Sequence, residues 1–142
     1  MLGVAPWTKY RIFAMTGVYE LELEPEVEDW LGELSAKHYT RVMAAADLLA
    51  EHEGVLGEPY AKHLQGKVRE LRFYLDTTAW RITYWIGPGR RIILLTVFRK
   101  TKDREQAQVE RAVVAQVRCE TKHPPAEHVY DRKVTIEPEE SK

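Results

Sequence analysis

Basic side chains stand at positions of this chain where they could hold a phosphate. The segment LLTVFRKTKDREQ, residues 94–106, passes from an apolar stretch directly into Arg99, Lys100 and Lys102. Arg81 lies within the apolar stretch AWRITYWI, where a charge is costly unless it is paired or its face of a strand is open. Fixed cations stabilise the negative charge that develops on phosphorus during phosphodiester cleavage. The same pattern also suits a solvated strand end, so the residues alone leave both interpretations open.

A second polar pair precedes Arg81 in the segment VRELRFYL, residues 68–75. Two-residue alternation places Glu70 and Arg72 on one face of a strand there. If this strand pairs with the one that carries Arg81, the three side chains form a polar stripe across two strands. A structural ion pair and a phosphate clamp explain such a stripe equally well.

Three aromatic residues near this stripe, Tyr74, Tyr84 and Trp85, could stack nucleic-acid bases if they are exposed. We take Tyr84 as a substrate-binding candidate, although aromatic residues in strands also commonly fill the core.

Other kinds of active site have no support in the chain. The five histidines show no paired spacing on one element, and Cys119, the single cysteine, has no cysteine partner. The two serines lie in no nucleophile motif, and GPGR at 87–90 is a hairpin turn, not a phosphate loop before a helix. The sequence therefore predicts no metal site and no cofactor.

Composition indicates one globular domain. The chain has 142 residues, 44% of them hydrophobic and 30% charged, and a net charge of −1. That balance conceals an asymmetry, because residues 20–58 carry eleven acidic and two basic side chains, whereas residues 60–118 carry five acidic and thirteen basic. No signal peptide or membrane-spanning run is evident, and a single cysteine suits a reducing compartment, so we expect a cytoplasmic protein.

Apolar periodicity predicts the elements that position these residues. VYELELEP (18–25) alternates like a strand, and helical spacing follows over 25–34 and 36–53. Residues 56–66 resemble a loop, and three strands are expected at 68–75, 79–86 and 90–98. A last helix begins near Asp103, an expected N-cap, and a polar tail begins at 119. The fold class is therefore α+β: an N-terminal strand and helical hairpin packed on an antiparallel sheet, with a terminal helix and the second sheet face free.

These segments together resemble the RelE/ParE toxin superfamily, and most closely its HigB-like, phage-derived branch. The resemblance is carried by ELEPEVEDWLGEL, LGEPYAKHLQGKVRELRF, WRITYWIGPGRRIILLTVFRKTKD and EQAQVERA. It covers residues 18–118, with residues 1–17 as an N-terminal extension and 119–142 as a C-terminal tail. Met15 stands where such toxins commonly begin, so the first residues are either an additional strand or a misassigned start.

The resemblance implies a microbial-RNase-like fold and a toxin of a type II toxin–antitoxin system. Such toxins are usually metal-independent endoribonucleases that cut mRNA on the ribosome, and their partner here would be a HigA-like helix-turn-helix antitoxin. Matched by position, the candidate catalytic residues are Arg72, Arg81, Lys100 and Lys102. Arg99, Glu70 and Tyr84 are the candidate substrate contacts. The family's catalytic Tyr or His near the C-terminus has no counterpart in the last helix, which leaves the general base open.

Two other functions remain compatible with the sequence. One is a non-catalytic inhibitor of DNA gyrase and replication, as in the ParE branch of the superfamily. The other is a binding module in which the charged residues form only structural ion pairs.

Overall fold

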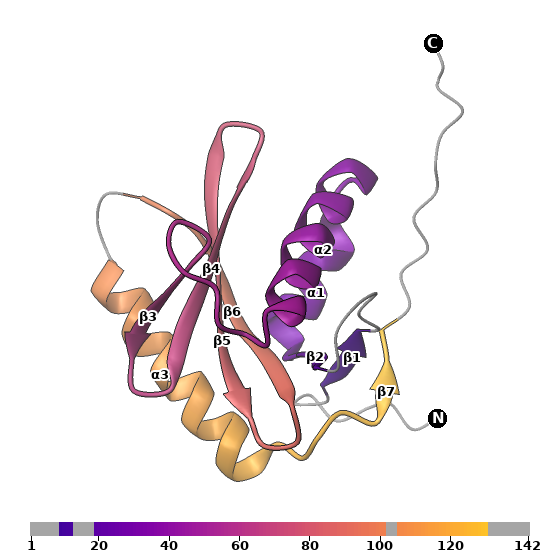
Figure 1. Ribbon diagram of the computed structural model, residues 1–142, viewed down its shortest axis with the longest axis vertical. Helices are drawn as coiled ribbons and strands as arrows, with labels where there is room; N and C mark the ends of the chain where they lie inside the picture. Colours follow the sequence, from indigo (N-terminus) through magenta and orange to yellow (C-terminus); the bar gives the residue numbers. More distant parts are fainter. Residues whose placement is uncertain (1–8, 13–18, 102–104, 131–142) are drawn as a thin grey trace.

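The computed structural model describes residues 9–12, 19–101 and 105–130, and it confirms the α+β class. Figure 1 shows a twisted sheet with α1 and α2 on one side and α3 crossing the other. In chain order the elements are β1 (Tyr10–Ile12), β2 (Glu20–Leu23), α1 (Pro25–Glu33), α2 (Ala36–Glu51), β3 (Ala61–Gln65), β4 (Val68–Leu75), β5 (Thr78–Gly87), β6 (Arg91–Arg99), α3 (Glu105–Lys122) and β7 (His128–Val129).

The sheet is mostly antiparallel, as expected, but two of its strand pairings are parallel. Its strand order is β3-β4-β5-β6-β2-β1-β7. The hairpin-connected strands β3 to β6 pair antiparallel, but β2 pairs parallel with β6, and β7 pairs parallel with β1. Both parallel partners are distant in sequence, so no turn geometry specifies their direction.

The predicted helical hairpin forms and covers one face of the sheet. Pro25 occupies the first turn of α1, and the Ser35 hydroxyl caps α2 by accepting the His38 backbone N–H at 3.1 Å. Gly54, with φ of 82°, lies just beyond the helix end. The main core joins these helices to β2, β4, β5 and β6 through residues such as Leu21, Val27, Leu31, Val42, Leu49, Leu71, Ile82, Tyr84 and Leu94.

The second face is not free along its whole length, because α3 packs across part of it (Figure 1). Ala112 and Cys119 of α3 join a smaller core with residues of β4, β5 and β6, namely Val68, Trp85, Ile93 and Leu95. The helix continues to Lys122, so Cys119, expected at the start of a polar tail, is a buried helical residue. Among the described residues, the part of this face that α3 does not cover carries Glu70 and Arg72 of β4 and Arg81 of β5.

Three flanking predictions change in detail. The expected loop at 56–66 contains β3, an edge strand in which only Ala61 is buried, so its sequence lacks apolar alternation. The N-terminal extension contributes β1, and the C-terminal tail contributes β7. Asp103, the expected N-cap, and the tail beyond residue 130 lie outside the described residues.

A buried ion pair anchors the residue that precedes β1. Lys9 Nζ lies 3.2 Å from Glu22 Oε1, and both side chains are 1% exposed. Arg91 Nη1 reaches the same oxygen at 3.0 Å. Lys9 is therefore part of the folded domain rather than an appendage.

Replacing Lys9 with methionine is expected to lower the free energy of unfolding by about 2 kcal/mol, because one partner of a buried carboxylate is lost while Arg91 remains. The matched control is Lys37→Met, since Lys37 pairs with Asp76 at 3.5 Å but its side chain is 83% exposed. We expect the control to cost less than about 0.5 kcal/mol in urea denaturation. Equal losses in the two variants would contradict the structural role of Lys9.

Candidate functional site

Two arginines stand side by side on the uncovered part of the sheet. Arg72 of β4 and Arg81 of β5 are direct cross-strand partners. Glu70 lies beside both, with its Oε2 2.9 Å from Arg72 Nε and 3.5 Å from Arg81 Nε. Like charges placed opposite each other destabilise a sheet, so Glu70 holds the two guanidinium groups together.

This trio, Glu70, Arg72 and Arg81, retains hydrogen-bonding capacity. The side chain of Glu70 is 2% exposed, that of Arg81 12% and that of Arg72 23%. Arg81 donates to the Trp80 carbonyl, but its Nε and the second oxygen of Glu70 have no hydrogen-bond partner among the described residues. Each guanidinium carries five N–H donors, so the trio can donate further bonds to a phosphate at the surface.

Strand β6 separates the predicted cations onto two faces. Thr83 pairs with Thr96 and Tyr84 with Leu94, which leaves Leu95 as the extra residue of a β-bulge. Beyond the bulge, Phe98 pairs with Arg81, whereas Arg99 pairs with Trp80 and lies on the face of α1 and α2. The structure therefore does not bring Arg99 together with the trio.

Lys100 follows β6 on the side of Phe98, the same side as Arg81. Its Nζ lies 2.9 Å from Glu105 Oε2 in the first turn of α3 and donates to the Thr101 carbonyl at 2.8 Å. The ammonium group is thus held at the junction of β6 and α3. Lys102 lies outside the described residues.

Tyr84 is not a base-stacking residue, which corrects the expectation from sequence. Its side chain is fully buried, its hydroxyl donates to the Gly54 carbonyl at 2.9 Å, and it accepts from Arg69 Nε at 3.2 Å. Burial raises the pKa of the Tyr84 phenol, and Arg69 partly opposes that shift. Trp85 is also buried, under α3, whereas Tyr74 is 61% exposed on the face of Arg72. Of the three aromatic candidates, Tyr74 alone is available to a ligand.

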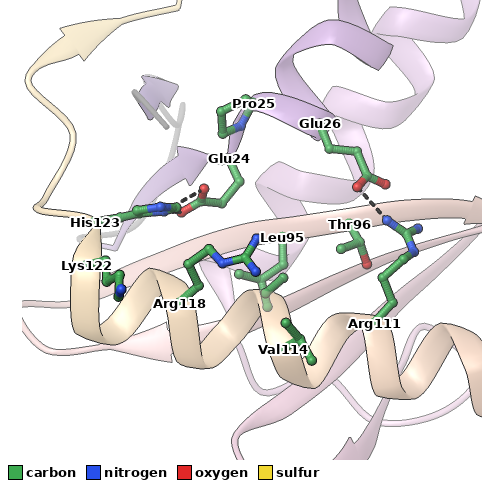
Figure 2. Close-up of a pocket in the computed structure, with 11 residues that line it drawn as sticks. Glu24, Pro25, Glu26, Leu95, Thr96, Arg111, Val114, Arg118, Lys122 and His123 are labelled. Atoms are coloured by element: carbon green, nitrogen blue, oxygen red, sulfur yellow. Dashed lines mark hydrogen bonds and ion pairs between the residues drawn. The ribbon is translucent and has the colours of Figure 1, made fainter. Parts of the chain in front are cut away.

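A cavity of about 720 Å³ lies between α3, the start of α1 and β6 (Figure 2). Its floor includes Leu95 and Thr96, and Arg118 and Val114 point into it from α3. Arg111 forms an ion pair with Glu26 at its edge. This cavity was not predicted from the sequence, although Arg111, Arg118 and Lys122 recur at a spacing that places them along one side of a helix.

Residues 29–120 match the family of phage-derived Gp49-like proteins (DUF891). The chain belongs to this family. Gp49-like proteins form part of the RelE/HigB toxin-like group, so the resemblance is confirmed at that level. A search of curated proteins finds no match to this chain. Within the described residues, no helix has the length and apolar character needed to cross a membrane.

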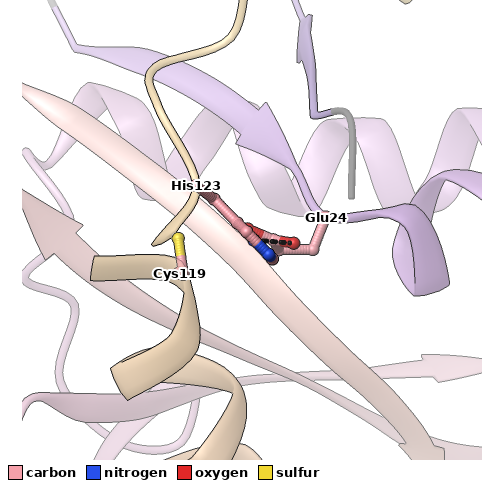
Figure 3. A group of neighbouring side chains, drawn as sticks. All are labelled: Glu24, Cys119 and His123. Carbon is pink, nitrogen blue, oxygen red and sulfur yellow. Dashed lines mark hydrogen bonds and ion pairs between the residues drawn. The ribbon is translucent and has the colours of Figure 1, made fainter. Parts of the chain in front are cut away.

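The Gp49-like segment contains the trio and Lys100, but β1, β2 and β7 flank it. One side-chain cluster joins the segment to its flanks. Cys119 Sγ, a ring nitrogen of His123 and a carboxylate oxygen of Glu24 all lie within 4.8 Å of one another (Figure 3). His123 Nδ1 is 3.0 Å from each oxygen of Glu24. A Cys-x-x-x-His spacing at the end of α3 is the sequence signal for this cluster, although the sequence was predicted to hold no metal site.

The Cys119 thiol is expected to be unreactive in the folded, metal-free protein. Burial, with a smaller contribution from the neighbouring Glu24, raises its pKa to about 11 from the ordinary thiol value of 9.0. The shift alone lowers the thiolate fraction at neutral pH about a hundredfold. Iodoacetamide labelling in the presence of EDTA should therefore be at least about a hundredfold slower than in urea-unfolded protein. Equal rates in the two states would contradict the buried position of Cys119.

Proposed function

We propose that this protein is the toxin of a type II toxin–antitoxin pair and a metal-independent endoribonuclease that cleaves mRNA on the ribosome. The observation that carries the proposal is the trio, two arginines held beside one buried carboxylate on an uncovered sheet face. Membership of a family in the RelE/HigB toxin-like group supports it. In the proposal the protein acts in the cytoplasm, where its substrate is translated.

The proposed reaction is attack of an RNA 2′-hydroxyl on the adjacent phosphorus. The new bond joins the 2′-oxygen to phosphorus, the bond from phosphorus to the 5′-oxygen breaks, and the proton of the 2′-hydroxyl leaves as one is delivered to the 5′-oxygen. A 2′,3′-cyclic phosphate and a free 5′-hydroxyl result. Negative charge grows on the non-bridging oxygens in the transition state, and preorganised cations stabilise it there.

Arg72 and Arg81 are the proposed phosphate ligands. Neighbouring guanidinium groups can each present paired N–H donors to phosphate oxygens. Glu70 keeps both groups in place, and its burial makes it a positioning residue more than a direct substrate contact. Glu70 already pairs with both arginines, so their guanidinium groups are held in place before the substrate binds. They therefore need not be ordered or desolvated during the reaction itself.

Lys100 and Tyr74 complete the proposed site. Lys100 would add positive charge next to the scissile phosphate or move a proton, and Glu105 limits the positions that its ammonium group can take. Exposed Tyr74 would stack a base beside that phosphate. Lys102 is retained as a candidate of the same kind as Lys100. Arg99 would reach the RNA only from the opposite face.

Induction of the gene in bacteria, followed by labelled precursors, tests the proposal. We expect amino-acid incorporation to stop first and primer extension to show cleaved mRNA. If DNA synthesis stops first and mRNA stays intact, the protein is instead a replication inhibitor of the gyrase-directed kind. If no synthesis is affected, the charged residues serve only structure. A neighbouring reading frame for a helix-turn-helix protein that relieves the arrest would identify the expected antitoxin.

A further inference from the structure

The cluster of Glu24, Cys119 and His123 is not part of the proposed nuclease site, and its three side chains have no role in the proposed reaction. Glu24 lies between β2 and α1, Cys119 is in the last turns of α3, and His123 follows that helix directly. Their side chains are largely buried, with Cys119 1% exposed and the side chains of Glu24 and His123 8% and 10%. A sulfur, a nitrogen and a carboxylate oxygen thus converge from separate segments in a region of restricted solvent access (Figure 3).

We propose that this cluster binds one divalent transition-metal ion, with zinc as the best match. Zinc accepts Cys sulfur, His nitrogen and carboxylate oxygen together, whereas calcium and magnesium prefer sites made only of oxygen. Ligand atoms around tetrahedral zinc stand about 3.3–3.6 Å apart. The atoms of this cluster lie within 4.8 Å of one another, and the His123–Glu24 distance is 3.0 Å, so small side-chain rotations achieve that geometry.

Two hydrogen-bond donors face the sulfur and would support it as a metal ligand. Trp85 Nε1 lies 3.4 Å from Sγ, and Lys9 Nζ lies 3.7 Å from it. Donors of this kind orient and stabilise a metal-bound ligand, and a coordinating thiol loses its proton outright. Lys9 pairs with Glu22 at 3.2 Å, and this carboxylate offsets the repulsion between the Lys9 ammonium group and a bound metal cation.

The fourth coordination position would face the cavity described above. Glu24 and His123 line that cavity, whereas the buried Cys119 belongs to α3. Three protein ligands and one open position are the arrangement of zinc sites that retain a water molecule or bind an external donor. Metal binding would also tie the end of α3 to the junction of β2 and α1, because each element contributes a ligand.

Cobalt titration of the metal-free full-length chain tests the site, independently of any nuclease activity. Because Cys119 is the single cysteine, a thiolate-to-cobalt charge-transfer band reports this residue alone. We expect the band to saturate at one equivalent of cobalt and to disappear when one equivalent of zinc is added. Zinc should also raise the melting temperature of the wild-type chain, because a metal that binds the folded state stabilises it.

Variants separate the cluster from adventitious binding. Cys119→Ser should abolish the band and the zinc-induced rise in melting temperature, and His123→Ala and Glu24→Gln should each weaken cobalt affinity at least about tenfold. The control is His63→Ala, which alters an exposed histidine of β3 and should bind as the wild type does. The proposal fails if the wild-type chain gives no saturable band, or if both His123→Ala and Glu24→Gln keep wild-type affinity. The wild-type titration decides the matter even if a variant does not fold.

Discussion

Alanine at position 81 is expected to lower the rate of mRNA cleavage by about 10²- to 10³-fold, which is the usual loss for one preorganised charge donor. Arg81 stands opposite Arg72 across β4 and β5, and its Nε has no hydrogen-bond partner among the described residues. Its removal deletes half of the proposed phosphate clamp. The fold should persist, because Glu70 keeps its 2.9 Å contact with Arg72.

Two further variants test whether the loss of cleavage is specific to the guanidinium group of Arg81. Arg81→Lys retains the charge but loses the two-pronged geometry, so its rate should fall between those of the wild type and Arg81→Ala. Arg41→Ala, which changes an exposed arginine of α2, is the control for nonspecific loss of positive charge. Cleavage is measured by primer extension on a translated message, with circular dichroism to check the fold. Wild-type cleavage by Arg81→Ala would remove Arg81 from the proposed site.

Alanine at position 70 is expected to lower the free energy of unfolding by about 3–4 kcal/mol, because it leaves two guanidinium groups adjacent without a counter-charge. The Glu70 side chain is 2% exposed, so water cannot readily take its place. The partial exposure of Arg72 and Arg81 keeps the loss near the lower end of the range for a broken buried ion pair. Urea denaturation of the wild type and the variant measures the change.

Two comparisons test whether the loss comes from arginine repulsion. Glu51→Ala, an exposed acid of α2, should change the free energy of unfolding by less than about 0.5 kcal/mol. In the double variant Glu70→Ala with Arg81→Ala the repulsion is gone, so its loss should be smaller than the sum of the single losses. Strict additivity, or a Glu70→Ala loss below about 1 kcal/mol, would contradict the proposed role of Glu70.

Short-range patterns predicted the framework around the trio. The alternation in VRELRFYL predicted a strand at 68–75, which is the extent of β4, and placed Glu70 and Arg72 on one face. β3 was missed because an edge strand with one buried residue carries little apolar alternation. Tyr84 was misjudged for a related reason: the pattern placed it on a face with other apolar residues, but only the packing of that face showed that Tyr84 itself is fully buried.

The bulge at Leu95 decided which cations share a face with Arg81. Ile93 and Leu95 lie under α3. If the side chains of β6 alternated strictly after them, Arg99 would lie on the face of the trio and Lys100 on the face of the helical hairpin. The extra residue reverses that order, because one inserted residue exchanges the two faces of a strand beyond it. A single sequence does not reveal such a shift, since it depends on how β6 pairs with β5.

By itself, the sequence determined the helical hairpin, the three central strands, the shared face of Glu70 and Arg72, and the resemblance to the toxin group. Each of these follows from side chains close together in the chain, where periodicity and capping act. The tertiary structure alone decided the register of β6, the burial of Tyr84, the cavity beside α3, and the meeting of Glu24 with Cys119 and His123. Those features join residues far apart in sequence, and their free energy comes from packing and strand pairing that no local pattern encodes.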